Sequence, residues 1–434
     1  MTADRVSAVG GARSVPRPDE IAHDYLLLAL RLDQHVPGLV DGYFGPASLK
    51  AQVDMEQLHP PARLRGEAAA LRQRILDEVP QADRRAWLAA QLVALETQAA
   101  ALAGERLPYV EHIARCLDRP LEPRDEGAFD RAAAALDALL PGSDPLSDRL
   151  AAWDANLTIG PDRLPELVDW LVDRFRARAR ASFGLPAGEA VDVSLVRGQP
   201  WSGYTWYAGG GRSRVDLNLD LPIRAADFVH TIAHETYPGH HLEHAWKEAA
   251  LVEGAGRLEC SILLINTPEC LISEGLAEVG HAFATPPDED ADLLAEVYER
   301  AGLAIASDPG AARATAAIDA ALRVHRRTLG DARSHAALLR HADGASADET
   351  LDYLRRVGRM SAERAAKSLE FVDHPLWRTY VVVYDAGRAL LDRWLEKAPP
   401  DGRTERFGRL LREQLTPTGV AAEMGDLAPT AQRP

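Results

Sequence analysis

Apolar residues recur at helical spacing through the first part of the chain. Pro18-Asp19-Glu20 resembles a helix start and opens an amphipathic run that continues to Gln34. Further helical runs, separated by Pro and Gly, cover Leu64 to Val79, Trp87 to Leu102 and Leu164 to Phe175. The pattern predicts a loose tail over residues 1–17 and an all-helical N-terminal region over residues 18–185.

The period changes to two between Glu189 and Asp220. Apolar and polar residues alternate in three short segments there: Val191 to Leu195, Tyr204 to Trp206 and Val215 to Leu219. A glycine run, residues 209–211, separates the last two segments. We expect a small antiparallel β-sheet at this point.

Helical spacing returns after Arg224 and continues almost to the C-terminus. The helical runs are Ala225 to Lys247, Glu269 to Ala284, Ala291 to Ile305, Ala311 to Leu329 and Trp377 to Leu395. Residues 186–420 therefore form a second region, and residues 421–434 are expected to be a loose tail. The predicted fold class is mainly α, with one small sheet.

Composition narrows the classes of protein that this chain fits. With 434 residues, 46% of them hydrophobic, the chain is long enough to bury a large core. The net charge is −16 and the basic residues lie among acidic ones, so we expect no nucleic-acid partner. The three cysteines form no CxxC pair, and the longest apolar stretch is short, so we expect a cytoplasmic protein that does not bind membranes.

Five of the fourteen histidines lie between His230 and His244, and histidine is the commonest metal ligand. His234-Glu235 resembles the start of the HExxH zinc signature, in which the Glu acts as the base. Pro238 stands where the second His is expected. In a regular helix His240 and His241 would lie ~9 and ~10.5 Å along the axis from His234, too far to share an ion.

Pro238 and Gly239 offer a way to bring these histidines closer together. Proline removes a backbone donor and clashes with the carbonyl of residue 234, while glycine tolerates unusual dihedral angles. We therefore expect the helix to bulge or kink here. His230 and His244 are interpreted as packing or surface residues.

The segment HETYPGHH resembles the HExxPGHH signature of the bacterial domain of unknown function 885 family, which is regarded as a family of zinc metallopeptidases of gluzincin type. Two later segments agree with this resemblance. Glu274-Gly275-Leu276-Ala277 is similar to the family's EGWA signature, with Leu276 in place of the tryptophan, and Tyr384 to Gly387 resembles its YxxG element. The resemblance covers about Val191 to Arg393 and implies a large helical metallopeptidase-like architecture, with the sheet next to the HExxPGHH helix and one zinc ion per chain.

Dipeptidyl peptidase III is a more distant comparison, with an HExxGH motif and a downstream ExxxE helix. This resemblance implies that Glu274 is the third ligand and that Glu278 lies behind a ligand and orients it. It also places a ligand directly after the glycine, which favours His240 over His241. The expected metal ligands are then His234, His240 and Glu274, with His241 and Glu278 as the alternatives.

A hydrolytic zinc site also needs a base and a donor for the developing oxyanion. Glu235, next to a ligand, is the expected base. Tyr384 is the favoured oxyanion donor, with Tyr380, His281 and Tyr237 as alternatives.

The sheet before the motif could pair with an extended substrate by strand addition. Its aromatic residues Tyr204, Trp206 and Tyr207 would then contact a small peptide or amide substrate. The preferred function is hydrolysis of peptide or related amide bonds. The alternatives are an amide or ester hydrolase of a non-peptide metabolite and a metal-binding protein without catalysis, although the latter would not need Glu235.

Overall fold

The computed structural model describes residues 19–121, 125–199, 201–399 and 402–426 of the chain. The predicted tail over residues 1–17, and the end of the chain from residue 427, lie outside the described residues. The described part is mainly helical with small β-sheets, which confirms the predicted fold class.

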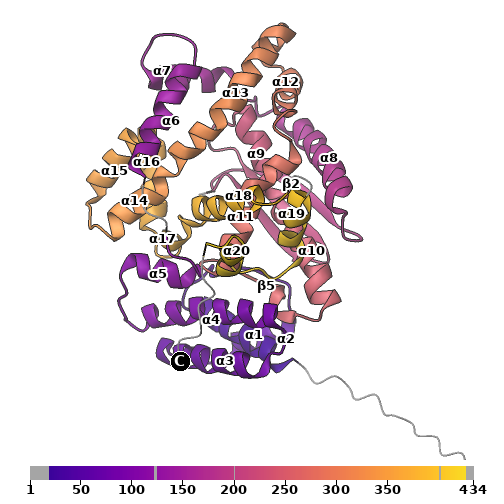
Figure 1. Cartoon of the computed structure of the whole chain (residues 1–434), viewed down its shortest axis with the longest axis vertical. Coiled ribbons are helices and arrows are strands. Elements are labelled where there is room, and N and C mark those ends of the chain that lie inside the picture. The colour runs from indigo at the N-terminus through magenta and orange to yellow at the C-terminus, as the bar shows by residue number, and fades with distance from the viewer. Residues whose placement is uncertain (1–18, 122–124, 200, 400–401, 427–434) are drawn as a thin grey trace, which may run out of the picture.

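The N-terminal helices form a layer at the bottom of Figure 1. They are α1 (Glu20–Asp33), α2 (Ala47–Met55), α3 (Pro61–Glu78), α4 (Ala82–Leu102) and α5 (Tyr109–Cys116). The side chain of Asp19 accepts a hydrogen bond from the Ala22 amide, so the predicted helix start is a true N-cap. This layer packs against the rest of the molecule through α4, which contacts α11 (Pro268–Ala284).

The N-terminal region is not all-helical as expected, because it contributes strand β1 (Val40–Tyr43). β1 pairs antiparallel with β5 (Ile262–Leu264), which lies just before α11. The segment Val-Asp-Gly-Tyr is too short to show an alternating pattern, and its partner lies more than 200 residues away. Neither feature can be seen in a local window of sequence.

The second sheet has the three expected strands, but it is not purely antiparallel. Its strands are β2 (Ala190–Val196), β3 (Gly203–Gly209) and β4 (Arg212–Asn218), in the order β2-β4-β3. β3 and β4 form an antiparallel hairpin, whereas β2 runs parallel to β4. Alternation locates strands and their faces without specifying the order or direction of pairing, and for this reason the expectation was wrong for β2.

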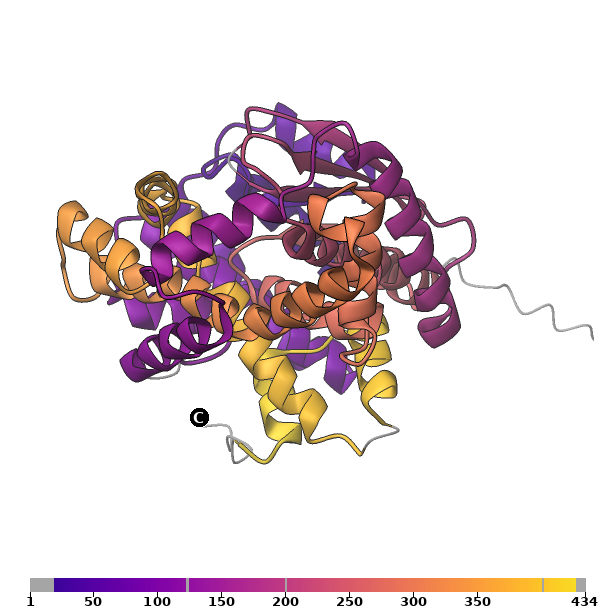
Figure 2. The ribbon, with the colours of Figure 1, turned by 90° about the horizontal axis from the view of Figure 1, so that it is seen from above.

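The remaining helices lie above the N-terminal layer in Figure 1, and Figure 2 shows them from above. Before the sheet lie α6 (Glu126–Leu139), α7 (Leu146–Asn156) and α8 (Leu164–Phe183). After it come α9 (Ala225–Glu235), α10 (His240–Lys247), α11, α12 (Asp290–Arg300), α13 (Pro309–Gly330), α14 (Ala332–His341), α15 (Ala347–Arg356), α16 (Ala362–Asp373), α17 (Trp377–Tyr380), α18 (Val383–Glu396), α19 (Arg403–Arg412) and α20 (Pro417–Glu423).

Several long helical runs in the sequence are divided in the structure. The run from Ala225 to Lys247 is broken between α9 and α10, as the Pro238-Gly239 pair predicts. The run from Trp377 is broken between α17 and α18. The tail expected from residue 421 was placed too early, because Ala421 is fully buried within α20.

Two apolar clusters hold the described residues together. The larger contains Tyr25 and Leu88 from the N-terminal layer together with Phe228 and Trp394, so that layer shares a core with the helices around the sheet. The smaller lies between α6, α13, α14, α15 and α16. The first cluster encloses α9 and α11, which carry the histidine and glutamate motifs.

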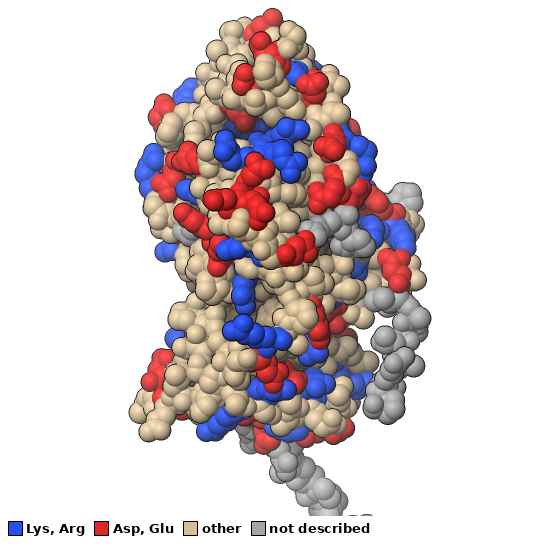
Figure 3. All heavy atoms as spheres, turned by 90° about the vertical axis from the view of Figure 1, so that its left-hand side faces the viewer, with Lys and Arg blue, Asp and Glu red and all other residues tan. Residues whose placement is uncertain are grey.

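The face drawn in Figure 3 carries both acidic and basic side chains. Among the described residues, no helix combines the length and the apolar character needed to cross a membrane.

Candidate metal centre

The HETYPGHH segment is the break between α9 and α10. The α9 helix ends at Glu235, the Tyr237–Pro238 bond is cis, and α10 begins at His240. A Cβ added to Gly239 would lie 1.8 Å from the carbonyl oxygen of His234, so no larger residue fits without moving the backbone. The break is a bulge, bridged by hydrogen bonds from the Gly239 amide to the Ala233 carbonyl (3.1 Å) and from the Leu242 amide to the Thr236 carbonyl (3.2 Å). Across it, the rings of His234 and His240 lie at a centroid distance of 4.8 Å.

The structure brings together the three residues expected to bind metal. His234 Nε2 lies 3.4 Å from Glu274 Oε2, and His240 Nε2 lies 3.5 Å from Glu274 Oε1. Two ligands that are each about 2.1 Å from a tetrahedral zinc ion lie about 3.4 Å apart. One ligand atom from each of the three residues falls within 4.8 Å of the other two. The spacing and the donor set therefore fit a zinc ion.

Burial and unmet hydrogen bonding support the same fit. The three side chains are only 7–9% exposed as residues, and Glu274 Oε2 is a buried oxygen without a hydrogen-bond partner among the described residues. A buried carboxylate oxygen that accepts no hydrogen bond is costly, and a bound cation would satisfy it.

The charges of these groups are strongly linked. Burial alone would raise the pKa of Glu274, but the rings of His240 and His234 outweigh burial and lower this pKa to about 2. Burial alone would lower the pKa of His240, but Glu274 and Glu243 raise it well above its ordinary value. Glu274 is therefore a carboxylate at any physiological pH, as a metal ligand must be.

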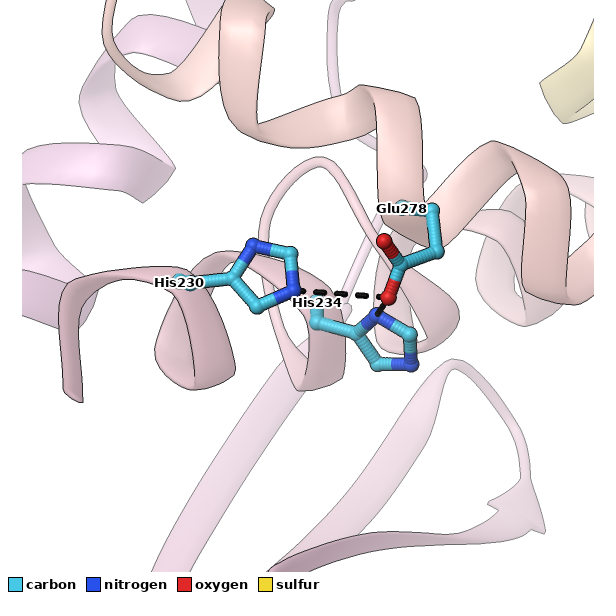
Figure 4. A group of neighbouring side chains, drawn as sticks. All are labelled: His230, His234 and Glu278. Atoms are coloured by element: carbon cyan, nitrogen blue, oxygen red, sulfur yellow. Dashed lines mark ion pairs between the residues drawn. The ribbon is translucent and has the colours of Figure 1, made fainter. Parts of the chain in front are cut away.

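His234 and His240 each have a second carboxylate on the side of the ring that faces away from Glu274. His234 Nδ1 lies 3.7 Å from Glu278 Oε1, and His230 Nε2 lies 3.4 Å from the same oxygen, so Glu278 sits between the two rings in Figure 4. Arg327 and Arg388 approach the other oxygen of Glu278 at 3.9 and 3.8 Å. Glu278 is thus well placed to orient His234, which is the role that the resemblance implies.

His240 has an equivalent arrangement, which no motif in the sequence indicates. The Ser273 hydroxyl lies 3.2 Å from His240 Nδ1 and donates to Glu243 Oε2 at 2.5 Å. Glu243 is fully buried and accepts a hydrogen bond from Lys247 at 2.7 Å. Its position three residues after His240 on a helix is a signal that could have identified it.

His241 points away from the other two histidines. Its Nδ1 lies 2.8 Å from the Ser213 hydroxyl and its Nε2 lies 3.0 Å from Glu189 Oε2. Tyr237, one of the alternative oxyanion donors, is also buried and donates to Glu189. Both residues thus hold the Pro-Gly turn against the sheet, and neither contacts the His234–Glu274 group.

Glu235 is held by strand β3. The Thr205 hydroxyl lies 2.6 Å from Glu235 Oε2 and 2.9 Å from its backbone carbonyl. A Cβ on Gly203 would lie 2.9 Å from Glu235 Oε1, so glycine leaves room for the carboxylate. The sheet therefore fixes the candidate base beside His234.

The tyrosines come from the C-terminal helices. Tyr380 donates to Glu274 Oε1, and the Tyr384 ring lies 5.4 Å from the Tyr380 ring, centroid to centroid. Burial, and then the charge of Glu274, raises the pKa of both tyrosines well above the ordinary value, so both stay protonated donors. Tyr384 and Tyr380 both lie at the site, whereas His281 faces Arg323 and Asp290.

A contact between two glycines positions these tyrosines. A Cβ on Gly275 would lie 2.7 Å from the carbonyl carbon of Gly387, and a Cβ on Gly387 would lie 2.5 Å from the carbonyl oxygen of Leu271. α11 and α18 therefore meet backbone to backbone. The glycines of the EGLA and YDAG segments are explained by this crossing.

The three aromatic residues of β3 differ in their environments. Tyr204 donates to Asp41 of β1, and its pKa is raised by burial and then by nearby carboxylates that include Glu235. Trp206 is 41% exposed. Tyr207 is only 6% exposed and donates to Glu248, so it does not face a substrate as expected.

Comparisons with known proteins are sparse. No family model matches the chain, and no curated protein matches it. One solved structure, described as that of "the putative lipoprotein from Colwellia psychrerythraea", is 14% identical with a TM-score of 0.49. The match covers 83% of this chain and 65% of that chain, and a likeness of this size carries no argument about function.

Proposed function

We propose that this protein is a zinc-dependent hydrolase that cleaves peptide or related amide bonds. The observation that carries the proposal is the convergence of His234, His240 and Glu274 at the mutual spacing of zinc ligands, with Glu235 held next to them. Two imidazoles and one carboxylate suit zinc and leave a fourth position open for water. A metal-binding protein without catalysis would not need Glu235.

A bound zinc ion would polarise the scissile carbonyl and make water acidic enough to lose a proton near neutral pH. Glu235 would accept that proton and later pass it to the leaving amine. Thr205 would keep the Glu235 carboxylate in position for both transfers.

Tyr384 would donate a hydrogen bond to the oxyanion that develops on the substrate. Its raised pKa supports this role, since the hydroxyl keeps its proton over the working range of pH. Tyr380 is the alternative donor, although its hydroxyl is engaged by Glu274.

The expected substrates are short peptides or small amides in the cytoplasm. Trp206 and Tyr204 on β3 are the proposed substrate contacts, because β3 is an edge strand beside Glu235.

Metal analysis by mass spectrometry on protein purified without added metal tests the proposal. We expect about one zinc per chain in the wild type and in H241A, and little in H234A, H240A and E274A. E235Q should keep the metal but lose at least ~100-fold in peptide hydrolysis. Wild-type protein that binds no zinc even when it is supplied would overturn the proposal, as would full activity of E235Q.

A further inference from the structure

Asp41 is an acidic residue at this site that no motif indicates. It lies on β1 between Val40, which is opposite Leu264, and Gly42, which is opposite Leu263. Those two partners are consecutive, so Asp41 is the extra residue of a β-bulge. Bulges re-aim a side chain and are frequent next to active sites.

The bulge directs Asp41 toward the metal centre. Tyr204 donates its hydroxyl to Asp41 Oδ1, and Tyr204 stands between Gly203 and Thr205, the two residues that contact Glu235. Burial raises the pKa of Asp41 to about 6, and the charges of Glu274 and Glu235 also act to raise it.

Asp41 forms no ion pair with a lysine or arginine among the described residues, and the charge of His240 acts to lower its pKa. The other acidic groups around the ligands are compensated: Glu278 lies near Arg327 and Arg388, and Glu243 pairs with Lys247. Asp41, Glu235 and the ligand Glu274 have no lysine or arginine partner among the described residues. Three carboxylates around one divalent ion leave a net charge of minus one, which a single ammonium group would neutralise.

We propose that Asp41 binds the free α-amino group of a peptide substrate, so that the enzyme acts as an exopeptidase at the amino terminus. This inference rests on the proposed function. A charge-assisted hydrogen bond from an ammonium to a half-buried carboxylate is strong, and losing one costs roughly 10- to 100-fold in binding. If Asp41 holds the α-amine of a peptide beside Glu235, a peptide bond close to the amino terminus would lie at the metal.

The alternative is that Asp41 has a purely structural role and only holds the Tyr204 side chain in position. The two readings differ in their effect on blocked substrates. If Asp41 only positions Tyr204, its loss reduces cleavage of free and acetylated peptides equally. If it binds the amine, its loss affects free peptides alone.

The test measures kcat and KM of the zinc-loaded full chain on unblocked tripeptides to hexapeptides, on their N-acetylated twins and on their C-amidated twins. We expect acetylation to lower kcat/KM roughly 10- to 100-fold and amidation to leave it nearly unchanged. In D41N the free peptides should lose a similar factor, mainly through KM, while the acetylated twins keep their wild-type rate. D41E should restore part of the preference, and Y204F should still prefer a free amine.

Each other outcome overturns the inference. Equal cleavage of free and acetylated peptides by the wild type, or an unchanged preference in D41N of normal zinc content, removes the role of Asp41 but leaves the hydrolase proposal standing. Loss of cleavage on C-amidation would assign recognition to the other terminus. If the zinc-loaded protein cleaves no peptide in any form, both proposals fail.

Discussion

His240 and His241 are adjacent in sequence but have different partners. His240 meets Glu274, whereas His241 meets Glu189 and Ser213. Residue spacing alone could not separate them, because the choice depends on how the chain turns at Pro238 and Gly239. The resemblance to a known motif favoured His240, and the geometry of the turn supplies the physical reason.

The H241A variant should fold less stably while retaining the metal site. His241 is fully buried, and its removal takes a hydrogen-bonding partner from the Glu189 carboxylate. We expect a loss of about 1.5–3 kcal/mol in the free energy of unfolding. Urea unfolding measures it, and a variant as stable as the wild type would contradict the assigned role.

Asp385, next to Tyr384, should make stability depend on pH. Burial raises its pKa to about 7 from an ordinary value of 3.8, and the charge of Asp331 adds to this. The folded protein therefore holds this proton more tightly than the unfolded chain. The protonated Asp385 carboxyl contributes its full stabilisation below the pKa that it has in the unfolded chain. This contribution is lost as the pH rises through the pKa that Asp385 has in the folded protein.

The neutral D385N side chain removes this dependence and can still accept the hydrogen bond from the Ser334 hydroxyl. D385N should gain stability relative to the wild type as the pH rises from about 5 to about 8. Melting temperatures in the presence of chelator measure this difference. Parallel curves for the two proteins would show that Asp385 does not carry the raised pKa.

At the scale of elements, the site depends on how α11 crosses α18. Glu274 lies on α11, Tyr384 lies on α18, and Gly275 and Gly387 allow their backbones to touch. The sequence identified both segments through their motifs. It could not show that they meet, because a contact across more than 100 residues leaves no local periodicity.

The G387A variant should push α18 away from α11. Overpacking at this contact is expected to cost about 1–3 kcal/mol and to reduce hydrolysis by moving Tyr384 relative to Glu274. Gly66 in α3 provides a matched control, since a Cβ there meets nothing within 4 Å and G66A should gain about 0.5–1 kcal/mol. The test measures thermal unfolding and peptide hydrolysis of both variants. If G387A and G66A have the same stability and the same activity, the close contact of α11 with α18 does not require glycine.

At the scale of the whole molecule, periodicity was sufficient to predict a mainly helical chain with one small sheet. It did not predict strand β1, which joins the N-terminal layer to the strand preceding α11. Asp41 was missed for the same reason, as it belongs to a four-residue strand that is ordered by a distant partner. The sequence pattern could not show which distant segments pair with each other.

Zinc should stabilise the entire fold, because the ligands lie on α9, α10 and α11 within the main core. A ligand present at about 1,000 times its Kd adds about 4 kcal/mol to the free energy of unfolding. Melting in zinc and in chelator should therefore differ by several degrees for the wild type and not at all for E274A. An identical melting temperature in both conditions would argue against a metal that bridges these helices.

The contact between Gly275 and Gly387 also limits how this protein can evolve. When a large residue in a core is enlarged further, a neighbour can often shrink to compensate. Here both partners already have the smallest side chain, and the atoms that a new methyl group would meet belong to the backbone. A mutation at either position has no single second-site suppressor at the other, so we expect both glycines to be refractory to replacement in any selection for activity.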